Sequence, residues 1–428
     1  MRRGSNPERP MNPENAVSDG RGIFLRFAML GGANIGGAGL SFVAALLVTR
    51  VAGASTFGQL SLGLTVLTYA LLITTFGTDV SAVRVAAAHP ETVPILFPSV
   101  TALRLGLAVP VCASIWLLAP LLADGHPAQA VLKIMAFSLF ANAFFPLWLP
   151  QAFDNALVTS ASNIGFHAVN LALTMIAAFL GMHVWAFAAS KLIADSLIAA
   201  MLFFWALRRY PGMQWSRGSR DSLRMARQSL PIALSQVVRG FAFASDILIV
   251  GIVLPAATVG HYSAAYRIFT LMLSMGSMYF IVLFPIMSRR AQDGDAIMGS
   301  EISLSLRRMI PVTLAIAGIV IATAPIVLPF AFGSDFAVAV PSLQILTLAI
   351  VANFIQRTYA RMILACGEAG LELRATILAT VLAVILKIYT TLGWGITGTA
   401  FATLIGEVVL LLLQRRYALR ILKMRSSI

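Results

Sequence analysis

Long apolar stretches alternate with short polar connections along almost the whole chain. A helix needs about 20 residues to cross the hydrocarbon core of a membrane, and about twelve stretches are long enough to do so. The pattern therefore predicts an all-α polytopic membrane protein with about twelve transmembrane helices. The predicted spans are 23–49, 58–78, 93–122, 130–150, 157–180, 184–207, 229–254, 258–287, 304–331, 337–365, 371–391 and 395–415.

Arginine is concentrated in alternate connections between these spans. The connections around Gly53, Pro255, Gly333 and Gly393 contain no basic cluster. Basic residues are retained on the cytoplasmic side during membrane insertion, so we expect the arginine-rich connections and both chain ends to be cytoplasmic in a bacterial inner membrane. The clusters comprise Arg208, Arg209, Arg217, Arg220, Arg224 and Arg227, then Arg289, Arg290, Arg307 and Arg308, and finally Arg415, Arg416, Arg420, Lys423 and Arg425.

Composition agrees with this assignment and excludes several functions. The 428 residues are 59% hydrophobic and 11% charged, whereas about 25% of residues are charged in a soluble domain. The net charge of +14 lies in membrane-flanking connections, where orientation explains it, so we expect no nucleic-acid partner. Cys112 and Cys366 fall in apolar stretches and are expected to be small buried hydrophobic residues. Without a Walker loop, a catalytic cluster or metal-ligand spacing, we expect no enzyme, cofactor or metal site.

The longest polar interval inside the membrane region falls halfway along the chain, at 208–228. It contains Pro211, Gly212 and Gly218 as well as six arginines, which is typical of a linker. The predicted organisation is a disordered cytoplasmic tail, an N-terminal six-helix bundle, a basic linker, a C-terminal six-helix bundle and a second tail. Their ranges are 1–22, 23–207, 208–228, 229–420 and 421–428.

The two predicted bundles show an internal repeat. Segments 54–61 and 256–263 agree at four of eight positions, at an offset of 202 residues. Two weaker matches pair Ala141-Asn142 with Ala352-Asn353, and Asp195 with Glu407, at offsets of 211 and 212. Because six helices is an even number, both repeats have the same orientation in the membrane. The sequence thus predicts parallel pseudo-two-fold duplication, an arrangement found in rocking transporters.

Several segments resemble the polysaccharide-type flippases of the multidrug/oligosaccharidyl-lipid/polysaccharide (MOP) exporter superfamily, and the resemblance extends over residues 22–420. They are Thr49–Gly53 with Phe57-Gly58, Asp246 with Val259–Ile268, Phe284–Arg289, and Phe332–Phe336. The resemblance implies two six-helix bundles around a V-shaped central cavity. It also implies translocation of undecaprenyl-diphosphate-linked oligosaccharide by alternating access, for O-antigen, capsule or exopolysaccharide synthesis. The implied partners are membrane lipids and the polymerase and glycosyltransferases of the pathway. The two extra C-terminal helices of lipid II flippases are absent from the pattern.

Basic side chains within the predicted spans are candidates for substrate binding. A charge at the centre of a transmembrane helix costs about 2.5–3.5 kcal/mol on insertion scales, so each such residue requires a structural or functional explanation. Guanidinium groups offer paired donors that suit a diphosphate. The predicted cavity residues are Arg50, Arg239, Tyr262, Tyr266 and Arg267. Alternatively, Arg50, Arg84 and Arg104 snorkel to the head groups, and Arg239 and Arg267 form structural pairs between helices.

Acidic residues within the spans are candidates for ion coupling. Asp246 lies near the middle of its predicted span and Glu407 lies deep in another. Either carboxylate would carry a coupling ion or would pair with a basic residue, which for Asp246 would be an arginine of another helix. Lys191 and Asp195 are four residues apart and are expected to form a local pair. His167 is expected to be a packing histidine.

Two other functions are weighed against the flippase. A multidrug exporter of the same superfamily that takes cationic drugs would need more acidic than basic residues in its cavity, and basic residues dominate here. A membrane polysaccharide polymerase or ligase would need a sizeable periplasmic loop, and all predicted outer connections are short. The pattern therefore favours a transporter of an anionic lipid.

The predicted topology can be tested with reporter fusions. We expect reporters at Gly218, at Asp293 and at both termini to report a cytoplasmic location, because basic residues flank them. Reporters at Gly53, Pro255 and Gly393 should report the periplasm. A periplasmic signal from the C-terminal fusion would contradict the even number of helices and the parallel repeat.

Overall fold

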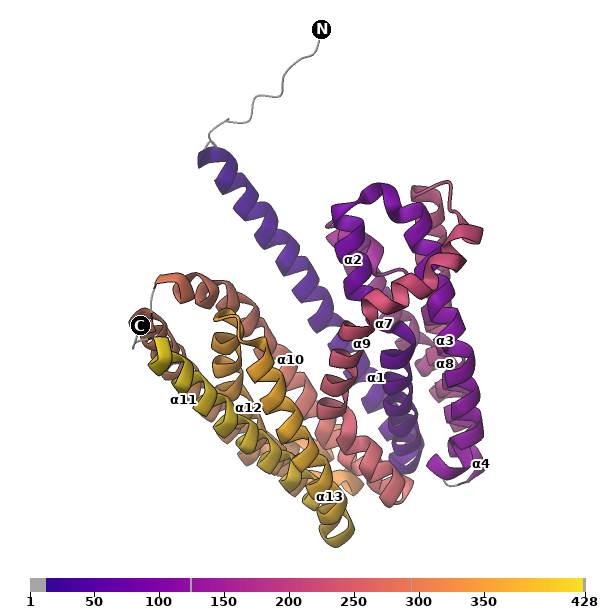
Figure 1. Ribbon diagram of the computed structural model, residues 1–428. Coiled ribbons are helices and arrows are strands. Elements are labelled where there is room, and N and C mark those ends of the chain that lie inside the picture. The colour runs from indigo at the N-terminus through magenta and orange to yellow at the C-terminus, as the bar shows by residue number, and fades with distance from the viewer. Residues whose placement is uncertain (1–12, 124, 294, 426–428) are drawn as a thin grey trace.

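The computed structural model describes residues 13–123, 125–293 and 295–425, and all regular structure in these ranges is helical (Figure 1). The elements in chain order are α1 Pro13–Thr75, α2 Thr78–Ala88, η1 Pro90–Thr92, α3 Val93–Leu122, α4 His126–Ala136, α5 Ser138–Ala143, α6 Trp148–Ala152, α7 Ala156–Phe179, α8 Val184–Arg209, α9 Trp215–Val253, α10 Ala256–Asp293, α11 Asp295–Phe332, η2 Ser334–Ala339, α12 Val340–Ala365 and α13 Ala369–Arg425.

Two of the long helices are broken at a glycine. Gly53 divides α1 (φ 78°, ψ 178°) and Gly395 divides α13 (φ 61°, ψ −143°). Residues with a Cβ atom rarely adopt these backbone angles, whereas glycine does so readily. Each helix therefore has two arms, which correspond to the predicted span pairs 23–49 with 58–78 and 371–391 with 395–415.

Other boundaries differ from the sequence prediction. The predicted span 130–150 is divided among α4, α5 and α6, and Pro146 lies in the gap between α5 and α6. The stretch 13–22, predicted to be disordered, belongs to α1, which begins at a proline as many helices do; residues 1–12 lie outside the described part. Most of the predicted linker 208–228 is helical, since α9 begins at Trp215, and the predicted C-terminal tail is helical up to Arg425.

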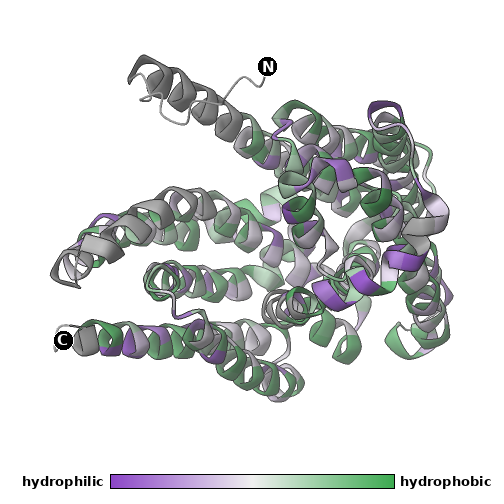
Figure 2. Cartoon of the chain, turned by 45° about the horizontal axis from the view of Figure 1, so that its top comes forward, coloured by the Kyte–Doolittle hydropathy of each residue, from purple (hydrophilic) through white to green (hydrophobic). Residues whose placement is uncertain are grey.

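The surface of the molecule is that of a membrane protein. Among the described residues, seven helices are long and apolar enough to cross a membrane, including α1 and α13, whose two arms are each long enough for one crossing. Figure 2 shows apolar residues along much of the length of the helices. Leu117, Phe179 and Phe330 are each about 80% exposed. Such side chains need a hydrocarbon environment, so these faces contact lipid.

The helices form two lobes. The N-lobe consists of α1 to α8, and the C-lobe of α10 to α13; α9 passes from one to the other, and its segment around Asp246 packs with the C-lobe. Helix α1 packs on α7 of its own lobe and on α10 of the other, and α9 packs on α3 as well as on α13. In Figure 1 the lobes diverge towards the end of the molecule that holds the C-terminus. We call this the open end, and we call the other end, with the turns at Gly53, Pro255 and Gly395, the closed end.

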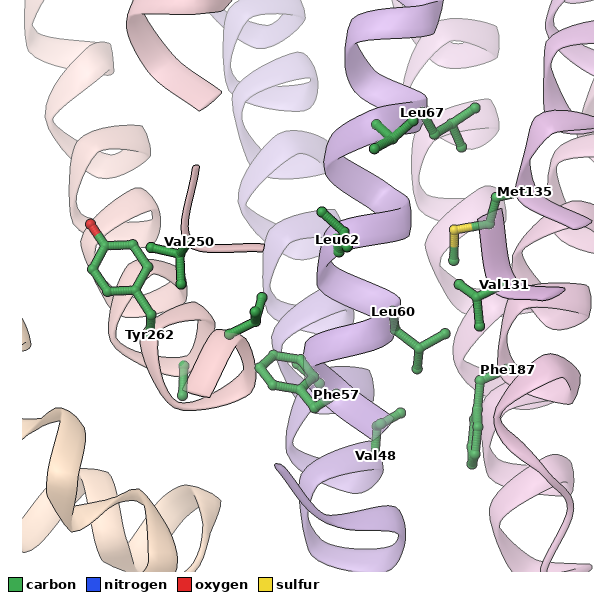
Figure 3. Close-up of a cluster of buried hydrophobic side chains, with 14 of the residues drawn as sticks. Val48, Phe57, Leu60, Leu62, Leu67, Val131, Met135, Phe187, Val250 and Tyr262 are labelled. Atoms are coloured by element: carbon green, nitrogen blue, oxygen red, sulfur yellow. The ribbon is translucent and has the colours of Figure 1, made fainter. Parts of the chain in front are cut away.

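The hydrophobic cores explain this shape. One core includes residues of both lobes, among them Phe57 of α1, Tyr262 of α10 and Phe332 of α11; Figure 3 shows part of it. Two further cores lie mainly within one lobe each: one around Trp148 in the N-lobe, to which Met225 of α9 contributes, and one around Phe280 in the C-lobe. The lobes thus share apolar packing near the closed end and have separate cores elsewhere.

A reciprocal backbone contact joins the lobes at the closed end. A Cβ atom on Gly58 would lie 1.8 Å from the carbonyl oxygen of Ala256, and a Cβ atom on Gly260 would lie 2.0 Å from the carbonyl oxygen of Ala54. Gly58 and Gly260 occupy equivalent positions of the sequence repeat. A contact in which residue i meets j′ and j meets i′ is the pattern that a two-fold axis produces, so the contact agrees with parallel duplication.

We expect Gly58→Ala to lower the melting temperature of the purified protein. The new methyl group would overlap the Ala256 carbonyl, and overpacking of this kind typically costs about 1–3 kcal/mol. The control is Gly39→Ala in α1, where a Cβ atom would meet nothing within 4 Å. That control should be neutral or stabilising, because alanine is the better helix former by about 1 kcal/mol. Equal melting temperatures for both variants would contradict the proposed close contact.

Candidate functional site

A cavity lies between the two lobes. Its main part has a volume of about 400 Å³, and a smaller part of about 260 Å³ shares several lining residues with it. Helices α1, α7 and α8 of the N-lobe and α10 of the C-lobe supply most of the wall. The residues common to both parts are Ser41, His167, Arg267 and Thr270.

Two basic side chains line this cavity from opposite lobes. Arg267 of α10 donates a hydrogen bond from Nη1 to Oγ of Ser41 in α1, at 3.1 Å. Lys191 of α8 contacts both carboxylate oxygens of Asp195, at 2.8 and 2.7 Å, and its ammonium lies 4.7 Å from the ring centre of Phe166. Arg267 lies in the cavity wall, where it was expected, and its role in substrate binding stays a prediction. Lys191 and Asp195 form the expected local pair. The sequence reasoning missed that Lys191 also faces the cavity.

Neutral polar groups complete the cavity wall. Asn163 donates from Nδ2 to Oδ1 of Asn34 at 2.6 Å, and His167 lies against Gly37, where a Cβ atom would approach its ring within 2.5 Å. A third pocket of about 270 Å³ adjoins the first at Phe166 and Lys191 and adds two more neutral polar side chains, Asn142 and Ser162. Amide and hydroxyl groups both donate and accept hydrogen bonds, as sugar hydroxyls require. The additional polar residues are Asn142, Ser162, Asn170 and Thr174.

The tyrosines predicted to line the cavity have different surroundings. Tyr266 lines it beside Arg267. Tyr262 is completely buried, and its hydroxyl donates to Asp246 at 2.8 Å, so its assignment to the cavity wall is wrong. The two rings are stacked with their centres 6.0 Å apart. Tyr262 lies one helical turn nearer the closed end, where α9 and α13 pack around it.

The other predicted arginines have different surroundings. Arg50 is exposed at the closed end, where it donates to the carbonyl oxygen of Ala331 at 3.0 Å and to that of Phe330. It therefore links the lobes outside the cavity and is not a lining residue. The side chain of Arg239 lies outside the described residues, so its predicted role stays a prediction.

Arg104 does not snorkel. It is 2% exposed, donates from Nη2 to Asp79 at 2.5 Å and from Nε to the hydroxyl of Thr78 at 2.9 Å. A buried guanidinium needs a partner, and Asp79 at the start of α2 supplies it. Arg84 is exposed on the same helix.

Asp246 of α9 lies in a buried polar cluster of the C-lobe. Its Oδ2 accepts from Tyr262 at 2.8 Å and from the hydroxyl of Thr403 at 2.7 Å, and its Oδ1 pairs with the ammonium of Lys387. Lys387 also donates to Oγ of Ser245 at 3.0 Å. The basic partner is thus a lysine of α13, whereas the sequence reasoning had considered an arginine. A lysine within the predicted span 371–391 was the signal that it missed.

Glu407 of α13 lies near this cluster and has a different partner. Its Oε2 accepts from Nδ2 of Asn353 at 3.0 Å. Arg357 of α12, one turn after Asn353, has its guanidinium 6.0 Å from the ring centre of Phe280. The two residues of each weaker repeat match, Asn142 with Asn353 and Asp195 with Glu407, therefore both contribute polar groups to the interior of their lobes.

Known proteins resemble this chain in sequence and in fold. The family described as "Polysaccharide biosynthesis protein" matches residues 26–290. A probable low-salt glycan biosynthesis flippase, Agl15 of Haloferax volcanii, is 26% identical over 229 residues, which are 52% of this chain and 48% of that protein. The chain thus aligns with about half the length of this curated relative.

Solved structures show the fold. An inward-facing multidrug resistance MATE transporter of the MOP superfamily superposes with a TM-score of 0.72 at 16% identity, covering 91% of this chain and 95% of that one. The lipid II flippase MurJ, in an inward closed conformation, gives a TM-score of 0.72 at 15% identity and covers 91% and 87%. A MOP transporter of Pyrococcus furiosus, described as having a binding pocket of reverse polarity, gives a TM-score of 0.62 at 16% identity and covers 94% of this chain and 96% of that one. The match over 26–290 and these superpositions together show that the chain belongs to the polysaccharide biosynthesis protein family and has the MOP transporter fold.

Proposed function

We propose that this protein is a flippase that moves undecaprenyl-diphosphate-linked oligosaccharide across the bacterial inner membrane by alternating access. The observation that carries the proposal is the cavity between the lobes, in which Arg267 and Lys191 face a wall rich in amide and hydroxyl groups. The cationic part suits a diphosphate and the neutral polar part suits sugars. The family assignment and the resemblance to a glycan flippase support the same substrate class.

The electrostatic task is to carry a diphosphate through a region of low dielectric constant. Charges interact far more strongly there than in water, so even single basic groups lower the cost of entry. Arg267 can offer paired donors to phosphate oxygens, whereas Lys191 acts as a point charge whose attraction is moderated by Asp195. Because the two cations stand on different lobes, the bound anion would bridge the lobes and be released when they separate.

Access to the cavity is from the open end. The shared hydrophobic core and the Gly58–Ala256 contact close the other end. We assign the open end to the cytoplasm, because the arginine-rich C-terminal part of α13 lies there. The structure would then be the state that accepts substrate, and rocking of the lobes would open the closed end. The proposed product serves O-antigen, capsule or exopolysaccharide synthesis, with the polymerase and glycosyltransferases of the pathway as partners.

A multidrug exporter is the second candidate, because MATE transporters share the fold. Such a protein would need a carboxylate available to a cationic drug. Both oxygens of Asp195, the carboxylate in the cavity wall, are engaged by Lys191. The charges of the described cavity residues therefore favour an anionic substrate.

We expect Arg267→Ala to reduce flipping of a fluorescent polyprenyl-diphosphate oligosaccharide in proteoliposomes by about tenfold or more, since a hydrogen bond to a charged group contributes about 1.5–3 kcal/mol. Arg267→Lys should recover part of the rate, because it restores the charge and not the paired donors. Arg84→Ala, which removes an exposed arginine from α2, serves as the control and should flip normally. Normal flipping by correctly folded Arg267→Ala would exclude the diphosphate site.

Energy for a vectorial step must come from an ion gradient or from consumption of the product. We propose Glu407 as the ion-coupling carboxylate, with a proton as the ion, because the hydrogen bond that it accepts comes from the neutral amide of Asn353, while the charges of Arg357 and Lys387 act on it from nearby. Glu407→Gln should abolish stimulation by an imposed proton gradient and leave slow equilibration between the leaflets. Glu372→Gln, at the start of α13, is the control. If the flipping rate of the wild-type protein is the same with and without the gradient, consumption of the product alone drives transport.

A further inference from the structure

The buried cluster around Asp246 has the composition of a cation site. Asp246 is 1% exposed and Lys387 is 3% exposed. The acceptors of the lysine ammonium are one oxygen of the Asp246 carboxylate and the hydroxyl of Ser245. Carboxylate and hydroxyl oxygens are also the ligands that hard metal cations prefer. The lysine ammonium thus stands where a small monovalent cation would satisfy the same oxygens.

Both carboxylate oxygens of Asp246 have partners among the described residues. Its Oδ1 meets Lys387, and its Oδ2 accepts two hydroxyl hydrogens, from Tyr262 and Thr403. These partners come from α10 and from both arms of α13, so one carboxylate on α9 holds four helical segments together. A diffusible cation could take the position beside Oδ1 only if the ammonium left it. Removing one partner of a buried ion pair strongly destabilises the protein, because the other charge is left buried and uncompensated.

We propose that the Lys387 ammonium is a tethered counter-ion that occupies the cation position of Asp246. This site of the C-lobe then exchanges no sodium or other free cation during transport, and Asp246 has a fixed structural charge. The alternative considered from the sequence, that Asp246 carries the coupling ion, is replaced by this assignment. The proposal concerns cation use and does not depend on which substrate the cavity binds.

The experiment compares thermal unfolding of purified protein in sodium chloride and in choline chloride at equal ionic strength. Choline is too large to take the place of an ammonium group beside a buried carboxylate. For the wild-type protein we expect the same melting temperature in both salts. For Lys387→Ala we expect a lower melting temperature in choline and a saturable rise of several degrees as sodium is added, because sodium would fill the vacated position.

A double variant provides the matched control. Lys387→Ala combined with Asp246→Asn removes both charges, so its melting temperature should not respond to sodium. If Lys387→Ala does not yield folded protein, Lys387→Met, which retains the volume of the side chain, should bind sodium less well and melt below the double variant.

Two results would overturn the proposal. One is a saturable sodium-dependent rise in the melting temperature of the wild-type protein that Asp246→Asn abolishes, because the site would then bind a free cation. The other is a folded Lys387→Ala variant with no response to sodium. Both readouts are made without substrate, so they are separate from the flipping assays that test the transport function.

Discussion

The close approach of the two lobes at Gly58 and Gly260 is the contact on which the rest of the architecture depends. Each glycine lies against a carbonyl oxygen of the other lobe, and a side chain at either position would occupy that space. Because the shared core is near this end, the lobes are free to diverge at the other, and the cavity forms where they separate. A polar substrate can reach the middle of the membrane only through such a one-sided opening.

The charged side chains in the interior differ in whether they have an ionic partner. Arg104 and Asp246 are buried and have ionic partners, so their charges contribute to the packing of one lobe. Arg267, in contrast, contacts the hydroxyl of Ser41 across the lobe boundary, and a hydroxyl does not neutralise it. A pair within a lobe survives rocking, whereas a cation at the boundary remains available to an anionic ligand.

Patterns that are local in sequence predicted the structure well. Apolar length predicted most spans, and a spacing of four predicted the pair of Lys191 and Asp195. The contacts of Gly58 and Gly260 are compatible with the predicted repeat. Contacts between distant segments were not predictable. Lys387 meets Asp246 across more than a hundred residues, and spacing holds no information about such a partner. The difference between Tyr262 and Tyr266 likewise depends on which helices pack around each turn of α10.

Helix α10 carries both a residue that contacts the buried Asp246 and a basic residue of the cavity wall. Tyr262 belongs to the fixed cluster on Asp246, and Arg267, a little more than one turn later, faces the cavity. Since the cluster ties α9, α10 and α13 together, the part of α10 that carries Arg267 must move with the C-lobe. Its partner Ser41 belongs to the N-lobe, so the surroundings of the guanidinium change whenever the angle between the lobes changes. Affinity for an anion at Arg267 would therefore follow the angle between the lobes, which is the property that alternating access requires of a binding group.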